Sequence, residues 1–76
     1  MEIPIPYFDS VHYSDLLEND IFYDSWDKCF YKMKTRDESD IDNGIFHMFN
    51  ISKNINQSCK DPGYKVYRIG IVNRAI

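Results

Sequence analysis

The segment Tyr64-Lys-Val-Tyr-Arg-Ile-Gly-Ile-Val72 decides the fold, because it is dense in aromatic and β-branched residues. The turn sequence Asp61-Pro-Gly63 comes directly before it. Successive side chains of a strand point to opposite faces. One face would carry Tyr64, Val66, Arg68, Gly70 and Val72, and the other Lys65, Tyr67, Ile69 and Ile71. We therefore expect a β-strand over residues 64–72.

A hairpin is expected before this strand, from residues 28–35 and 45–51. Basic residues and Phe30 alternate with Cys29, Tyr31 and Met33 in the first segment, and the second is β-prone. Asn43-Gly44 between the two segments is a strong turn signal. The alternatives are helical spacing over residues 26–35 and a helix over residues 40–56, in which Gly44 would cost about 1 kcal/mol.

The N-terminal third is expected to begin extended and then become helical. Ile3-Pro-Ile-Pro6 favours an extended arm or an edge strand, because proline fixes φ and cannot donate to a sheet ladder. Ser14 is a preferred helix N-cap residue. The later pairs Leu17/Ile21 and Phe22/Trp26 are spaced four apart, as on a helix face. We predict one or two helical segments between residues 10 and 27.

These assignments predict an α+β fold in which N-terminal helical segments pack on a small three-stranded antiparallel meander. A chain of 76 residues is expected to form a single domain over residues 1–76. Its 43% hydrophobic and 16% aromatic content exceeds that of disordered chains. A core this small gains stability by oligomerising, so a homodimer is an open alternative.

Charge is distributed in blocks that the net charge of −3 conceals. Residues 1–27 contain seven acidic residues and no Lys or Arg, whereas residues 28–36 contain four basic residues and no acid. Residues 37–42 are acidic again, and the remainder is basic apart from Asp61. Such asymmetry bears on partners and association rates rather than on fold. It is typical either of a solvated surface with internally paired charges or of an acidic face that meets a basic partner.

No motif for catalysis, metal binding or cofactor binding is present in the sequence, so we expect a non-enzyme without metal or cofactor. His12, Cys29, His47 and Cys59 are far apart, whereas zinc sites contain close pairs. The acidic loop lacks the glycine and closing glutamate of an EF-hand, and no phosphate-binding glycine loop occurs. Both cysteines are expected to be buried thiols, with a disulfide between them as the alternative.

The function that we predict is protein binding through an acidic face. Its partner would be another protein with a basic surface, such as the nucleic-acid channel of a host protein, and electrostatic attraction would speed association. A tyrosine would serve as an anchor, since Tyr is enriched at binding hot spots. The candidate site residues are Asp15, Glu18, Asp20, Tyr23, Asp24 and Asp27.

Small size, residues with AT-rich codons and acidic patches resemble those of phage-encoded proteins that block host machinery, including anti-restriction and anti-CRISPR proteins. This likeness implies an inhibitor of a host defence protein, encoded by a phage or another mobile element. No segment approaches the roughly 20 apolar residues that span a bilayer, and no signal peptide is recognised. We expect a cytoplasmic protein that does not bind membranes, in the host cytoplasm if it is phage-encoded.

A different class of function is a small nucleic-acid-binding regulator. Tyr64 and Tyr67 could stack on bases while Lys65 and Arg68 hold phosphates. The acidic N-terminal block opposes such binding, so direct nucleic-acid binding is the weaker hypothesis. The alternative interpretation places Tyr67 in the core and leaves the two basic residues as a solvated flank of the strand.

Overall fold

The computed structural model describes residues 1–75 and contains a six-stranded antiparallel sheet. The strands are β1 (Glu2–His12), β2 (Ile21–Asp24), β3 (Cys29–Met33), β4 (Ile45–Asn50), β5 (Ile55–Lys60) and β6 (Lys65–Ala75). Their order across the sheet is β1-β6-β2-β3-β4-β5. The last strand is thus inserted between the first strand and the β2–β5 meander.

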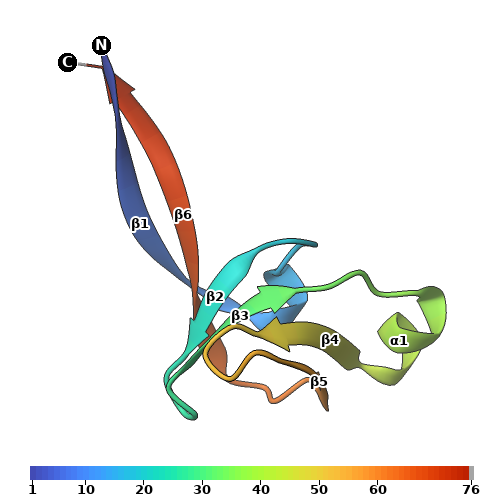
Figure 1. Cartoon of the computed structure of the whole chain (residues 1–76). Helices are drawn as coiled ribbons and strands as arrows, with labels where there is room; N and C mark the ends of the chain where they lie inside the picture. Colours follow the sequence, from blue (N-terminus) through green and yellow to red (C-terminus); the bar gives the residue numbers. More distant parts are fainter. Residues whose placement is uncertain (76) are drawn as a thin grey trace.

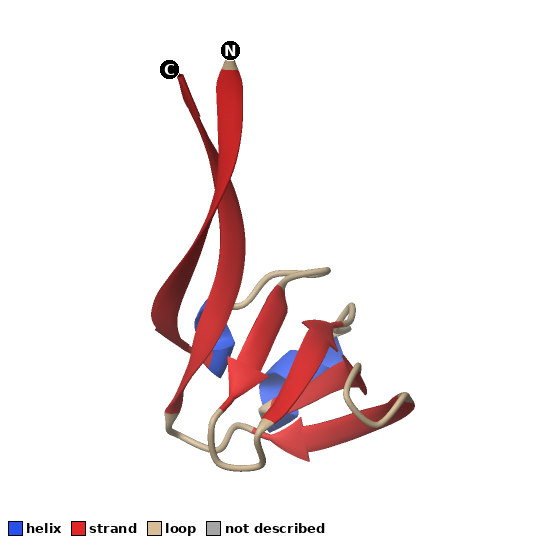
Figure 2. Ribbon diagram, turned by 60° about the vertical axis from the view of Figure 1, so that its left-hand side comes forward, coloured by secondary structure: helices blue, strands red, loops and turns tan. Residues whose placement is uncertain are grey.

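β1 and β6 form a long ribbon that extends well beyond the rest of the sheet. They pair over their whole length, from Glu2 opposite Ala75 to His12 opposite Lys65. β2 pairs with β6 only from Tyr67 to Ile69, so beyond Ile69 the described sheet is two strands wide. Figures 1 and 2 show this ribbon projecting from the body, with both chain ends at its tip.

Alternation along the strands places the core on one face of the sheet, which we call the core face. Large apolar side chains from β2, β3, β4 and β6 point to this face, where Phe22 and Val66 are fully buried. Tyr13 and Leu16, from the connection between β1 and β2, cover it. The core consists of Tyr13, Leu16, Phe22, Cys29, Tyr31, Met33, Phe46, Met48 and Val66.

A buried carboxylate connects three parts of this core. Asp24 at the end of β2 is only 2% exposed. Its side chain accepts hydrogen bonds from the Tyr64 hydroxyl at 2.7 Å, the Tyr13 hydroxyl at 3.2 Å and the Trp26 amide at 2.9 Å. A buried charge is tolerated when hydrogen bonds replace its water. Asp24 therefore ties β2 to the β1–β2 connection and to the residue that precedes β6.

Two short helical segments complete the described structure. A single 3-10 turn, η1, spans Tyr13–Asp15, and α1 spans Glu38–Asn43. The Asp37 side chain caps α1 by accepting from the Asp40 amide at 2.8 Å. Gly44 ends the helix with φ of 67°, a left-handed conformation that glycine adopts without steric cost. α1 lies beyond the ends of β3 and β4 in Figure 1.

The predicted α+β fold is wrong, because six strands dominate the structure and no N-terminal helix packs on a three-stranded meander. Within residues 10–27, β1 continues to His12, the helix predicted after Ser14 stops after one turn, and β2 follows. Asn19 has a φ of 70°, which a right-handed helix does not allow. Phe22 and Trp26 do not share a helix face, because Phe22 lies in β2 and Trp26 lies in the turn that follows it.

The strand predictions outside that region are confirmed. β6 begins one residue later than predicted, at Lys65, and covers the rest of the segment 64–72 with the expected faces. β3 and β4 form the expected antiparallel pair, and the proline-containing arm is an edge strand. α1 was not expected in the acidic loop, and β5 lies in a polar segment that carries little strand signal. Among residues 1–75 no helix has the length and hydropathy to cross a membrane. Cys29 and Cys59 are free thiols, the first buried and the second half-buried.

Replacing the buried carboxylate tests the importance of the Asp24 network. Asp24→Ala should lower the free energy of unfolding by about 3 kcal/mol, because the buried Tyr13 hydroxyl, the half-buried Tyr64 hydroxyl and the Trp26 amide lose their acceptor. Urea unfolding followed by circular dichroism measures this. The matched control is Asp42→Ala, an exposed aspartate of α1, which should change stability by less than about 0.5 kcal/mol. Equal losses in the two variants would contradict the assigned role of Asp24.

Candidate functional site

The face of the sheet opposite the core face, which we call the open face, carries a row of aromatic side chains. Tyr67 of β6 pairs directly with Tyr23 of β2, and Tyr23 pairs with Phe30 of β3. On β1 the direct partner of Tyr67 is Ser10. Phe8 is two residues before Ser10, so it lies diagonally beside Tyr67 on the same face. We call these four residues the aromatic stripe. Each comes from a different strand, and the four strands are neighbours in the sheet.

The stripe is exposed although its rings are large. Phe8 is 66% exposed, Tyr67 44% and Phe30 42%, while Tyr23 is half-buried. The rings of Tyr23 and Phe30 are in contact, with centroids 4.9 Å apart. The four side chains line a shallow hollow of about 300 Å³. Exposed apolar groups that form a contiguous patch mark binding surfaces more often than scattered ones do.

Lysines lie beside the stripe on the same face. Lys65 is two residues before Tyr67 on β6, and Lys32 is two residues after Phe30 on β3, so alternation places both on the open face. Arg68 lies on the core face instead. Its guanidinium is 3.1 Å from the Asp9 carboxylate and 3.9 Å from that of Asp20. The two basic residues that the sequence grouped on β6 therefore have different surroundings.

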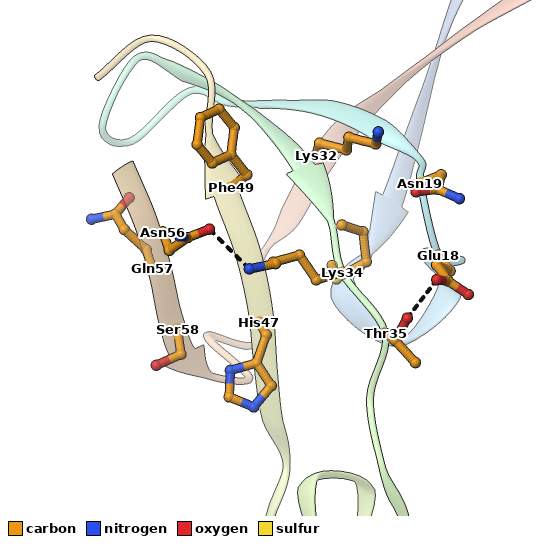
Figure 3. Close-up of a pocket in the computed structure, with 11 residues that line it drawn as sticks. Glu18, Asn19, Lys32, Lys34, Thr35, His47, Phe49, Asn56, Gln57 and Ser58 are labelled. Atoms are coloured by element: carbon orange, nitrogen blue, oxygen red, sulfur yellow. Dashed lines mark hydrogen bonds between the residues drawn. The ribbon is translucent and has the colours of Figure 1, made fainter. Parts of the chain in front are cut away.

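A second, more polar hollow of about 800 Å³ lies near β3, β4 and β5. Figure 3 shows Lys34 reaching across β4 to Asn56, with its Nζ donating to Oδ1 at 2.8 Å. The Thr35 hydroxyl donates to the Glu18 carboxylate on the opposite side. Lys32, Lys34, His47 and Phe49 all line this hollow. It could hold a polar or anionic group beside an aromatic ring.

His47 on β4 also connects this hollow to α1. Its Nε2 lies 3.1 Å from Oδ1 of Asp40. The pKa of the Asp40 carboxyl is lowered, first by hydrogen bonding with the backbone of Asp37 and then by the His47 side chain. The short helix is thus held on the sheet by a contact that depends on an ionised carboxylate.

Tyr23 and Asp24 were expected to act on one surface, but the structure places them on opposite faces. They are consecutive residues of β2, so Tyr23 joins the aromatic stripe while Asp24 enters the core. Burial raises the pKa of the Tyr13 and Tyr64 hydroxyls, and the bonds to Asp24 contribute in the same direction. These hydroxyls consequently stay protonated and donate to Asp24 at neutral pH.

The other candidate acids make local contacts in the connections next to β2. Asp15 accepts from the His12 amide at 3.4 Å, and Asp20 from the Leu17 amide at 2.8 Å. Asp27 accepts from the Cys29 amide at 3.0 Å and from the Tyr31 hydroxyl. Glu18 accepts from Thr35. Asp15, Glu18 and Asp27 remain exposed and Asp20 is half-buried, so their charge still contributes to the field at the surface.

Sequence reasoning did not select Phe8 or Phe30, and it assigned Tyr67 either to base stacking or to the core. The alternation of Phe30 with Cys29 and Tyr31 was visible, and it placed Phe30 on the side of the lysines. Phe8 gave no comparable signal, because its neighbour is known only from the pairing of β1 with β6.

No group of three or more His, Cys, Asp or Glu side chains among residues 1–75 is arranged to hold a metal ion. Burial raises the pKa of the Cys59 thiol, and nearby carboxylates contribute, so little thiolate forms at neutral pH. Comparison of the chain with protein-family models, with curated proteins and with solved structures found no match.

The Asp40–His47 contact gives a pH prediction. A lowered carboxyl pKa contributes stability that is present above the unfolded-state value near 3.8 and is lost as pH falls through the folded-state value. His47→Ala should move the Asp40 pKa part of the way back toward 3.8, because the bond with Asp37 remains. NMR titration of the Asp40 carboxyl measures this. His12→Ala is the control, and an equal shift in that variant would contradict the assignment.

Proposed function

We propose that this protein is a non-enzymatic protein-binding module and that the aromatic stripe is its central contact surface. One observation carries this proposal: four aromatic side chains from four adjacent strands share the open face, and residues 1–75 leave three of them exposed and Tyr23 half-buried. Aromatic residues are enriched at the centres of protein interfaces. Truncating such residues accounts for most of the binding energy that alanine scanning detects.

The position of the stripe on a sheet favours tight binding. Neighbouring strands hold the backbone beneath each ring, so little conformational entropy remains to be lost on association. Tyr23 and Phe30 already pack against each other, which restricts their side chains before any partner arrives. A preorganised surface of this kind converts a larger share of its buried apolar area into affinity.

We further propose that the partner is a host protein with a basic surface and that this chain inhibits it. The exposed acidic residues favour such a partner. Asp15, Glu18 and Asp27 are exposed in connections next to β2. Their local hydrogen bonds leave the negative charge in place, and exposed charge accelerates encounter with an opposite potential. In this proposal the stripe supplies affinity while the acids supply association rate.

Variants of the stripe test the proposal once a partner has been captured from the native source and purified. Phe30→Ala and Tyr67→Ala should each weaken its affinity about 30-fold, which corresponds to about 2 kcal/mol for a hot-spot residue. Surface plasmon resonance measures both affinity and association rate. Raising the salt concentration should slow association without abolishing binding.

The matched control is Ile41→Ala, which removes an exposed apolar side chain of α1 that is 57% exposed and outside the stripe. It should leave the affinity unchanged. If Phe30→Ala and Tyr67→Ala bound as tightly as the unmodified chain, the stripe would not be the contact surface. Circular dichroism of each variant verifies that the fold is retained.

A second candidate function is the binding of single-stranded nucleic acid on the open face. It is favoured by the placement of Lys32 and Lys65 beside the stripe, because aromatic rings stack on bases while lysines neutralise phosphates. Lys34 lies on the same side and lines the polar hollow. This candidate uses the same rings as the protein-binding proposal but needs the lysines as well.

Fluorescence anisotropy with a labelled single-stranded oligonucleotide tests this candidate. Binding at low salt should weaken as salt rises, and Lys32→Ala or Lys65→Ala should each reduce the salt slope by about 0.7. Lys53→Ala, in the turn between β4 and β5, is the control and should leave the slope unchanged. No binding at low salt would eliminate this candidate and leave the protein-binding proposal standing.

A further inference from the structure

The projecting part of the β1–β6 ribbon has two edges of different character. Along β1 the outer edge contains Pro4 and Pro6, which have no N–H group to donate. Along β6 the edge beyond Ile69 contains no proline, and residues 70–75 pair with β1 alone in the described structure. Prolines on an edge strand prevent further strand addition, so only the β6 edge is open to another strand.

The register shows which backbone groups face the open edge. In an antiparallel ladder the N–H and C=O of one residue point to the same side, and this side alternates along the strand. Asn73 is opposite Pro4 and Ile71 is opposite Pro6. Since the prolines cannot donate to the ladder, these pairs are the non-hydrogen-bonded ones. Ile71 and Asn73 therefore direct their N–H and C=O groups away from β1, as Ile69 does where β2 pairs with it.

The side chains of the ribbon are almost without charge. Residues 1–8 and 69–75 contain two charged side chains, Glu2 and Arg74, whereas 28% of the whole chain is charged. Ile71 is 69% exposed, and Val72 is 45% exposed on the opposite face. A two-stranded ribbon is marginally stable in water without further packing. The ribbon therefore has apolar side chains on both faces and a β6 edge that residues 1–75 leave unpaired.

We propose that a second copy of this chain supplies that strand, through antiparallel pairing of the 71–75 segments of two β6 strands. Ile69 is already paired with Ile21, so the segment available on each copy begins after it. Antiparallel pairing of residues 71–75 with their own copy places Asn73 opposite Asn73 on a two-fold axis. The result is a four-stranded sheet in the order β1-β6-β6-β1. This inference does not depend on the proposed function.

Two features of the chain favour a second copy as the occupant. A single segment that pairs with itself forms a closed two-fold contact, so assembly stops at the dimer. Each chain also carries a net charge of −3, which makes most surfaces of two copies repel. The segment 71–75 contains none of the twelve acidic side chains of the chain and one basic side chain, Arg74, so the acids that repel between two copies lie outside the proposed contact.

Proline substitution distinguishes the two edges of the ribbon. Asn73→Pro removes an N–H that faces the open edge and leaves the ladder with β1 intact, because Asn73 is already opposite a proline. In a two-fold dimer this hydrogen bond is lost twice, once from each copy, so the affinity of dimerisation should fall by about tenfold to a hundredfold. Ser10→Pro is the matched control, since register places its N–H on the outer edge of β1. It should leave dimerisation unchanged.

Light scattering coupled to size exclusion measures the oligomeric state at micromolar to millimolar concentrations. At the lowest concentration at which the unmodified chain and Ser10→Pro have twice the monomer mass of 9.1 kDa, Asn73→Pro should be mostly monomeric. A monomeric unmodified chain at every concentration would overturn the proposal. A dimer that forms as tightly in Asn73→Pro as in the unmodified chain, or that is lost in Ser10→Pro with the fold retained, would also overturn it by placing the contact elsewhere.

Cross-linking provides a second measurement that does not depend on proline being tolerated. Directly opposite residues of antiparallel strands have Cα atoms about 4.5 to 5.5 Å apart, within the range of a disulfide. With oxidised glutathione as oxidant and in a Cys59→Ser background, Asn73→Cys should form a covalent dimer. Asn43→Cys, on α1, is the control and should remain monomeric on a denaturing gel. Equal cross-linking of both variants would overturn the register.

Discussion

The antiparallel ladder between β1 and β6 is the contact on which the rest of the structure depends. It joins residues near the two ends of the chain, from Glu2 with Ala75 to His12 with Lys65. At its inner end it brings Val11 and Val66 to the core and places Phe8 beside Tyr67. Closing so long a loop costs entropy before the contacts that compensate for it are formed. We therefore expect the pairing of β2, β3 and β4 to precede the ladder during folding.

The small size of the chain explains why one face of the sheet is left open. A sheet of six strands has two faces, and 76 residues leave few side chains outside the strands to cover them. The available covering residues, Tyr13, Leu16 and Tyr64, all pack on the core face. Asp24 fixes this arrangement, since its carboxylate accepts from two of the covering tyrosines. On the open face, residues 1–75 provide no corresponding group of covering side chains, so its aromatic residues stay accessible.

The sequence predicted those elements whose signal is local. Alternation over residues 64–72 and 28–35 gave β6 and β3 with their correct faces. The hairpin turn predicted at Asn43-Gly44 is wrong, because Asn43 ends α1 and Gly44 caps it, so β3 and β4 are joined through a helix. Residues 10–27 were predicted wrongly, because short connections and a four-residue strand produce spacings of four that resemble a helix. What makes β1 a strand through His12 is its partner β6, more than fifty residues away, and no local pattern contains that partner. The same non-local pairing hid Phe8 as a member of the stripe.

The charge pattern along the chain and the charge pattern on the surface differ for a geometric reason. Lys32, Lys60 and Lys65 belong to strands in which alternation turns them to the open face. The strand aspartates Asp9 and Asp24 lie on the core face, the first bonded to Arg68 and the second to Tyr13 and Tyr64. An acidic chain can thus present a face on which Lys32, Lys60 and Lys65 lie among aromatic and aliphatic side chains. The exposed acids of the connections act on a partner at long range, whereas the individual side chains of the open face decide the contact itself.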